Sequence, residues 1–159
     1  MRQPTPHGAL RRLDVLVGAW DMWADGRSVG PVRTEFAWLE GGAFLAQRVD
    51  VTAESALPGP WEAAAPFPTV SLTGYDDTTD DFTTLYADGR GVGRVYRTSL
   101  SDGVWTQRRA APGFHQRFNA TFSDGGDTVA GGWERSKDGE LWKPDFDVTY
   151  TRVGTSPRA

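Results

Sequence analysis

The chain has 159 residues, a length that predicts one domain, 1–159, with a single core over residues 9–153. Its formal net charge of −4 argues against a nucleic-acid-binding protein, which would present a basic face. The chain has no cysteine, which excludes disulfides, thiolate metal sites and a cysteine nucleophile.

A short amphipathic helix is the first predicted element. Leu10, Leu13 and Leu16 share one face at helical spacing, and Gly18 is expected to end the helix. From Trp20 onward the apolar period changes to two, which indicates strands. About ten strands are predicted, over residues 20–24, 32–39, 43–51, 69–75, 82–87, 91–99, 104–109, 114–122, 128–136 and 142–153. The end of the chain, 154–159, is expected to fray.

Asp-Gly pairs mark the predicted turns, at residues 25–26, 88–89, 102–103, 124–125 and 138–139. Tight turns between paired strands need residues that tolerate positive φ, so an Asp-Gly step between apolar runs predicts a hairpin. A meander of this length must close on itself or stack, because it would otherwise expose its edge strands. The sequence therefore predicts an all-β fold, an up-and-down antiparallel β-barrel.

A proline-rich connection separates the third and fourth predicted strands. Residues 52–68 contain Pro58, Pro60, Pro66 and Pro68, and no strand is expected there because proline cannot donate to a ladder. Two interpretations stay open. The connection is either a lid over one barrel mouth, since long loops in compact domains are often functional, or a variable surface insertion.

Alternation within the strands predicts which side chains face the interior. In the eighth predicted strand Phe114, Gln116 and Phe118 face inward. His115 and Arg117, which lie between them, face the solvent. Several polar groups inside one barrel imply either a hydrogen-bond network in a filled core or a wet ligand cavity, and the expected width of the barrel favours a cavity.

The predicted cavity wall is aromatic with a few polar groups. Alternation does not decide whether Arg48 and Arg94 face inward, and one of the two is expected to be a charged anchor. The other expected lining residues are Trp38, Tyr96, Trp105, Gln107, Gln116, Phe118, Trp133 and Tyr150. Such a wall suits a flat or hydrophobic small molecule held by one or two hydrogen bonds.

The last predicted strand places Trp142 and Phe146 inward and Asp145 and Asp147 outward. With Glu134, the two outward carboxylates could form a calcium or magnesium site. Cross-strand ion pairs with the outward arginines of the neighbouring strands are the favoured alternative. These arginines are Arg97, Arg108 and Arg117.

Gly18-Ala19-Trp20, placed after the helix and opening the first strand, resembles the Gly-x-Trp signature of the lipocalin and calycin superfamily. The resemblance implies that the helix closes one barrel end and that an arginine of the last strand covers the tryptophan. Arg152 is at the matching position. An arginine over an indole is a cation–π pair, and its implied role is structural.

Further stretches are similar to a bacterial family of lipocalin-like proteins without a settled activity, over residues 13–153. They are residues 90–96, Trp105, 114–118, 133–139 and 145–147. The resemblance implies a ten-stranded calycin-like barrel that is distantly nitrobindin-like in shape. The chain lacks the glycine-rich run and the C-terminal histidine region of nitrobindins, so haem binding does not carry over.

The two histidines do not suggest a cofactor site. His7 lies in the proline-rich N-terminal arm and His115 faces outward, whereas a haem, a zinc ion or a Ser/His/Asp triad needs an inward histidine. We therefore expect no cofactor and no metal. The sequence shows neither a signal peptide nor about 18 consecutive apolar residues, so a cytoplasmic protein that does not bind membranes is expected.

The function expected from this pattern is binding of a hydrophobic or aromatic small molecule in the barrel cavity. An alternative is a cofactor-free cyclase or isomerase acting on a polyketide-like or other small metabolite. In that case Tyr96 or Tyr150, together with Arg48, would polarise a carbonyl. A filled core with a purely structural role is the third hypothesis. The expected partner is a small molecule rather than a nucleic acid or a membrane, and the oligomeric state stays open, a homodimer included.

Overall fold

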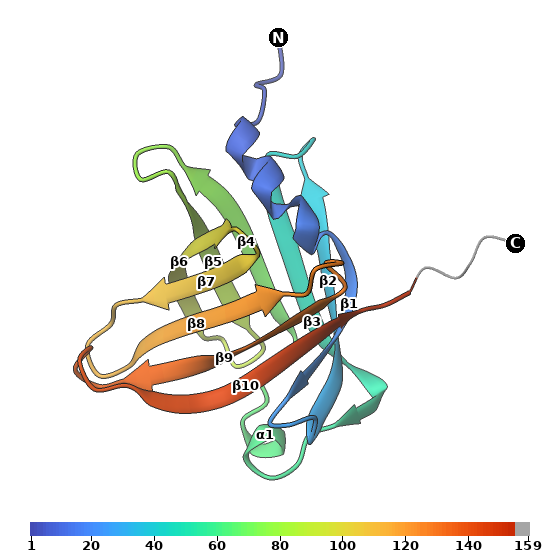
Figure 1. Ribbon diagram of the computed structural model, residues 1–159, viewed down its shortest axis with the longest axis vertical. Helices are drawn as coiled ribbons and strands as arrows, with labels where there is room; N and C mark the ends of the chain where they lie inside the picture. Colours follow the sequence, from blue (N-terminus) through green and yellow to red (C-terminus); the bar gives the residue numbers. More distant parts are fainter. Residues whose placement is uncertain (155–159) are drawn as a thin grey trace, which may run out of the picture.

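A computed structural model describes residues 1–154 and shows a closed antiparallel barrel (Figure 1). Its ten strands are β1 (Gly18–Ala24), β2 (Val29–Leu39), β3 (Phe44–Ala56), β4 (Thr69–Asp76), β5 (Asp81–Asp88), β6 (Gly93–Ser101), β7 (Val104–Arg109), β8 (His115–Phe122), β9 (Thr128–Ser136) and β10 (Lys143–Arg152). Each strand pairs with its neighbours in sequence, and β1 pairs with β10. The predicted all-β, up-and-down barrel of ten strands is confirmed. Residues 155–159 lie outside the described part, so the expectation for the end of the chain stays a prediction.

Each of the five Asp-Gly pairs lies in or beside a connection between consecutive strands, as predicted. The connection between β6 and β7 consists of Asp102 and Gly103 alone, with φ of 52° and 74°. Two consecutive residues with positive φ form the tight turn whose twist matches that of paired strands. An Asp-Gly step satisfies this requirement because both residues tolerate that conformation.

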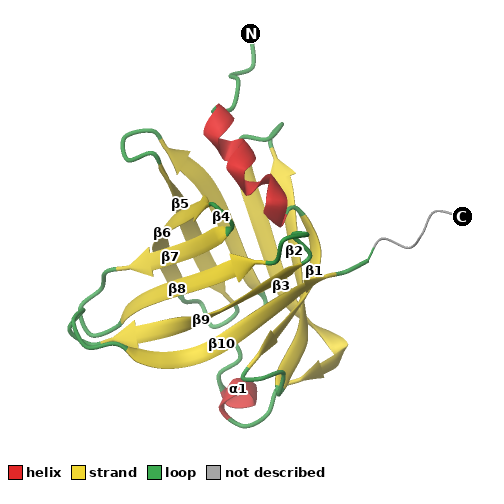
Figure 2. Cartoon of the chain, in the orientation of Figure 1, coloured by secondary structure: helices red, strands yellow, loops and turns green. Residues whose placement is uncertain are grey.

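Two short helices lie at opposite ends of the barrel (Figure 2). The 3₁₀ helix η1 (Gly8–Leu16) packs Leu10, Leu13 and Leu16 into one end, where all three are buried. The one-turn helix α1 (Pro60–Ala63) lies in the connection between β3 and β4, at the other end. The two ends are therefore different: η1 fills one with apolar side chains, and only the α1 end lies beside the cavity described below. Among residues 1–154, no helix is long and apolar enough to span a bilayer.

The proline-rich connection is shorter than predicted. Strand β3 continues to Ala56, beyond the expected end at Val51, and pairs there with Gly30 of β2 after a shift in register. The first proline, Pro58, follows two residues later, where the chain leaves the ladder. Pairing with the long strand β2 thus extends β3 as far as the prolines permit.

Trp142 was predicted to face inward, and the structure shows that it does not. The pairing with β9 slips between Pro144 and Phe146, so alternation does not carry across this point. Trp142 lies outside the cavity, with the Arg117 guanidinium 4.1 Å from the centre of its ring. Phe146, beyond the shift, lines the interior as predicted.

Candidate functional site

A cavity of about 420 Å³ occupies the half of the barrel nearer α1. Its wall comes from β1 and from every strand between β3 and β10, and residues of the 60–67 segment border it. The volume lies in the range of small-molecule sites. Apolar side chains fill the η1 half of the barrel instead, among them Leu13, Trp20 and Phe36.

Eight of the side chains proposed from the sequence line this cavity. They are Arg94, Tyr96, Trp105, Gln107, Gln116, Phe118, Trp133 and Tyr150. Strand alternation brings them together because each points inward from its own strand. The structure also decides the face of Arg94, which the sequence left open: it lies on the same side of β6 as the buried Tyr96.

Trp38 was expected in the cavity and lies elsewhere. It shares the inward face of β2 with Thr34 and Phe36, but it is near the η1 end of the strand. Its indole Nε1 donates to Asp14 Oδ1 of η1 at 2.9 Å, and the Arg11 guanidinium lies 4.2 Å from its ring. The inward face of Trp38 was predicted correctly, but its position along the barrel axis was not. Strand alternation does not indicate which end of the barrel a helix fills.

Arg48 points outward, so it is neither an anchor nor a catalytic group of the cavity. Its side chain is 63% exposed and lies 3.8 Å from Asp50. The adjacent Gln47 takes the inward position and lines the cavity together with Val49. The sequence left this choice open because apolar residues flank the pair Gln47-Arg48 on both sides.

The inner wall of the cavity is a continuous series of aromatic rings. Tyr96 contacts Trp133 edge-on, with ring centres 5.5 Å apart. Trp133 and Phe118 are 5.0 Å apart, Phe118 and Trp105 are 5.0 Å apart, and Trp105 and Tyr150 are 5.8 Å apart. Tilted and edge-on contacts at these distances are favourable and hold the rings in place. The wall is therefore a continuous apolar surface whose rings are held by one another.

A hydrogen-bonded pair of polar side chains interrupts the aromatic wall. The Tyr96 hydroxyl donates to Gln116 Oε1 at 2.7 Å, and both residues are buried. Burial raises the pKa of Tyr96, and the nearby Arg94 guanidinium acts in the opposite direction. Tyr96 is thus a protonated donor at neutral pH, and it orients the Gln116 amide at the cavity surface.

Other polar groups of the wall have no hydrogen-bond partner among residues 1–154. The Tyr150 hydroxyl and the Gln107 amide are two examples. Burial raises the pKa of Tyr150, so this hydroxyl is also a donor rather than a base at neutral pH. The indole Nε1 of Trp105 is buried without a partner in this part of the chain. Such groups are costly in a filled core, and a bound polar atom would satisfy them.

Two arginines lie at the mouth of the cavity in different electrostatic settings. Arg90 Nη2 contacts Asp88 Oδ2 at 2.7 Å, and the Tyr86 hydroxyl donates to the same carboxylate at 2.6 Å. The hydrogen bonds from Arg90 hold the pKa of Asp88 well below its usual range, while burial and the Asp88 hydrogen bond raise the pKa of Tyr86 to about 12. Arg94, in contrast, forms no ion pair within the described chain, and its guanidinium lies 5.1 Å from the Phe114 ring.

Residues 57–68, which we call the cover segment, lie across the mouth. Trp61 Nε1 donates to Asp25 Oδ2 at 2.8 Å, and the Trp61 ring contacts Phe146 edge-on at 5.1 Å. The backbone N–H of Gly89 donates to the Pro68 carbonyl at 2.8 Å and holds the far end of the segment. The proline-rich connection therefore contributes to the cavity wall, chiefly through Trp61 and Phe67.

Several lining residues were missed by the sequence analysis. Tyr86 lies two residues after an inward residue of β5, and Ser71 lies two residues after an inward residue of β4. The period-two pattern was therefore sufficient to find both. Trp61 and Asp25 had no such signal. Both lie in connections, and their meeting depends on the closure of the barrel.

The outward charges agree with the sequence analysis in part. Arg117 and Glu134 are direct cross-strand partners and form an ion pair at 2.9 Å, as predicted. Asp145 and Asp147 do not form the expected arginine pairs: Asp145 borders the cavity mouth and Asp147 Oδ1 accepts from the Gly26 N–H. Arg108 lies between Arg97 and Arg117 in the strand register. Within residues 1–154, no group of three or more His, Asp or Glu side chains is placed to hold a metal ion.

Comparison with known proteins supports the fold. No protein-family model and no curated protein matches the chain. Among solved structures it is similar to the crystal structure of Rv2717c from M. tuberculosis, with a TM-score of 0.50 and 15% sequence identity. The alignment covers 94% of this chain and 100% of that chain. Similarity at this level of identity concerns the fold, and a lipocalin-like barrel is consistent with it.

Proposed function

We propose that this protein binds a hydrophobic or aromatic small molecule in the barrel cavity. The observation that carries the proposal is the combination of volume and lining: about 420 Å³ bounded by a continuous aromatic wall. Pockets of this size and composition bury most of a small ligand, and a few polar groups orient it. In this cavity Tyr150 and Gln107 would be available for that purpose, because neither has a hydrogen-bond partner among residues 1–154.

Binding without turnover accounts for the polar groups better than catalysis. The pKa values of Tyr86, Tyr96 and Tyr150 are raised by burial, so these phenols donate hydrogen bonds at neutral pH and do not accept protons. A cyclase or isomerase that removes a proton needs a base near the bound substrate. The carboxylates of the lining, Asp25 and Asp145, are exposed at the rim, away from the aromatic wall. We therefore propose a binding protein.

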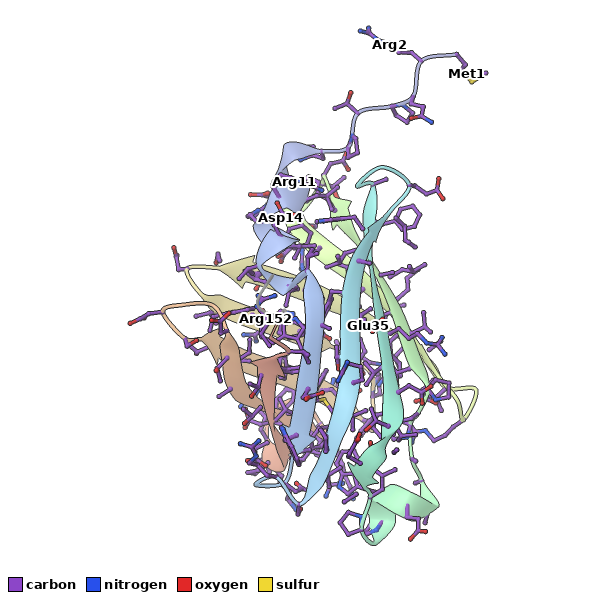
Figure 3. The ribbon with its side chains drawn as sticks, turned by 90° about the vertical axis from the view of Figure 1, so that its right-hand side faces the viewer. Met1, Arg2, Arg11, Asp14, Glu35 and Arg152 are labelled. Atoms are coloured by element: carbon purple, nitrogen blue, oxygen red, sulfur yellow. The ribbon has the colours of Figure 1, made fainter. Side chains whose placement is uncertain are left out.

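Membership of the calycin superfamily is part of the same proposal. It is supported by Trp20 at the start of β1, by η1 across the adjacent barrel end and by Arg152 over the indole. Figure 3 shows Arg152 beside the end of η1 that leads into β1. The resemblance implies that the helix closes this end, which agrees with a cavity on the α1 side.

Native mass spectrometry of the purified protein tests the proposal, followed by denaturing extraction of any compound that is retained. Saturable binding of the neutral dye N-phenyl-1-naphthylamine gives a second readout. Gln47→Trp fills the cavity from β3, whereas Arg48→Trp places the same ring on the outer face and is the matched control. We expect Gln47→Trp to lose both the retained compound and the dye. If the unmodified protein has the mass of the polypeptide alone and does not bind the dye, the proposal is contradicted.

A further inference from the structure

The mouth of the cavity carries opposite charges on opposite walls. In the closed strand order five steps separate β6 from β1 in either direction, so the two strands face each other across the barrel. Arg94 extends from β6, while Asp25 follows β1 and Asp145 lies in the adjacent strand β10. An anionic group of a ligand would therefore be attracted to the β6 wall and repelled from the opposite rim.

Arg94 differs from Arg90, the other arginine of the mouth, in having no counter-charge within residues 1–154. The Asp88 carboxylate, whose side chain is fully buried, neutralises Arg90. Asp25 accepts the Trp61 indole N–H. The Arg94 guanidinium lies beside the Tyr96 hydroxyl, and it forms no ion pair within residues 1–154, although the side chain is half-buried. A planar set of donors at an apolar surface matches the oxygens of an acidic group.

The neighbours of Arg94 place such an acid at the edge of the aromatic wall. Tyr86 is its cross-strand partner on β5, and Tyr96 lies two residues further along β6 on the same face. The guanidinium lies near the Phe114 ring, at 5.1 Å from its centre. A ligand anion bound by Arg94 would therefore leave its rings in contact with Trp133 and Phe118, deeper in the barrel.

We propose that the ligand of this cavity is an aromatic compound with one acidic oxygen group, a carboxylate or phenolate, and that Arg94 binds this group at the mouth. The inference rests on the proposed binding function and specifies its ligand class. In this proposal, each of two parts of the cavity binds a different part of the ligand. Arg94 binds the anion, and the aromatic wall between Tyr96 and Tyr150 binds the rings.

A pair of fluorescent dyes with the same ring system tests the ligand class. The probes are 8-anilinonaphthalene-1-sulfonate, which carries an anion, and N-phenyl-1-naphthylamine, which lacks it. For Arg94→Gln we expect about a tenfold or larger loss of affinity for the anionic dye, since a charge-assisted hydrogen bond to a half-buried guanidinium is removed. The neutral dye should bind Arg94→Gln and the unmodified protein within about twofold of each other. Arg48→Gln, on the outer face, is the matched control and should change neither affinity.

Each outcome separates the ligand class from the binding function. If Arg94→Gln binds the anionic dye as tightly as the unmodified protein does, the acidic ligand class is wrong, while binding of the neutral dye leaves the proposed function standing. If the unmodified protein binds neither dye, the proposed function itself is wrong. Arg94→Lys keeps the charge without the planar donors and should have intermediate affinity for the anionic dye. If Arg94→Gln and Arg94→Lys each lose affinity for both dyes to the same extent, the proposal is overturned, because Arg94 would then act on the shape of the cavity.

Discussion

Arg152 covers Trp20 from the directly opposite position of the neighbouring strand, with the guanidinium 4.1 Å from the centre of the indole. Its Nη1 donates to the Val17 carbonyl and its Nη2 to the Val15 carbonyl, each at 2.8 Å. The Trp20 indole donates to Leu16, also at 2.8 Å. One arginine thus joins the last strand, the first strand and the end of η1, and it closes the barrel opposite the cavity.

Replacing Arg152 is expected to destabilise the fold. Arg152→Met keeps much of the stem and removes the hydrogen bonds to the Val15 and Val17 carbonyls, so we expect a loss of about 2 kcal/mol or more in the free energy of unfolding. Urea denaturation measures it. Arg27→Met is the control, because Arg27 also lies over an indole, 4.5 Å from that of Trp23, but is exposed. Equal losses in the two variants would show that the carbonyl contacts of Arg152 contribute nothing.

The hydroxyl of Tyr96 should stabilise the barrel through Gln116. Tyr96→Phe leaves the buried Gln116 Oε1 without its donor, which costs about 1–3 kcal/mol for a buried acceptor. Denaturant unfolding gives the loss directly. Tyr75→Phe is the matched control, since the Tyr75 hydroxyl donates to the exposed Asp80 at 2.7 Å and water can replace it. A larger loss for Tyr75→Phe than for Tyr96→Phe would contradict the assignment.

Asp88 should make the stability of the fold depend on acid pH. Hydrogen bonds from Arg90 and Tyr86 lower the pKa of this carboxyl in the folded state below its ordinary value of 3.8. The stabilisation is therefore fully present above about pH 4 and is lost as the pH falls further, because the unfolded chain then binds the proton more strongly. Unfolding free energies of the unmodified protein and of Asp88→Asn should differ at pH 7 and converge toward pH 2. A difference that is independent of pH would argue against an ionised Asp88.

Trp61 should slow the escape of a bound ligand. Trp61→Ala removes both the hydrogen bond to Asp25 and the edge contact with Phe146 that hold the cover segment across the mouth. We expect dissociation of N-phenyl-1-naphthylamine to accelerate about tenfold, since changes at one binding site act mainly on the dissociation rate. Stopped-flow fluorescence measures this rate. Trp23→Ala, on the outer face of β1, is the control. Unchanged dissociation in Trp61→Ala would indicate that the ligand leaves by another route.

Strand positions and most of the cavity wall followed from local sequence patterns. The period of two along β6, β7 and β8 was sufficient to bring Tyr96, Gln107 and Gln116 to one surface, because each side chain points to a face set by its own strand. Asp102-Gly103 also indicated its turn from local sequence alone, because the turn needs two adjacent residues that tolerate positive φ. The pair of Trp20 and Arg152 was found from a resemblance, and the structure confirms their contact.

Only the tertiary structure decided where along the barrel each inward side chain lies. Trp38 faces inward and still misses the cavity, because η1 fills its end of the barrel. Gln47 faces the cavity and Arg48 faces outward because of how β3 pairs with β2 and β4, which local alternation does not specify. Trp142 lies outside because of a register shift, and Trp61 reaches Asp25 only when distant connections meet at one mouth. The sequence alone therefore determined the strands and most of their faces, whereas closure of the barrel determined which of those side chains form the site.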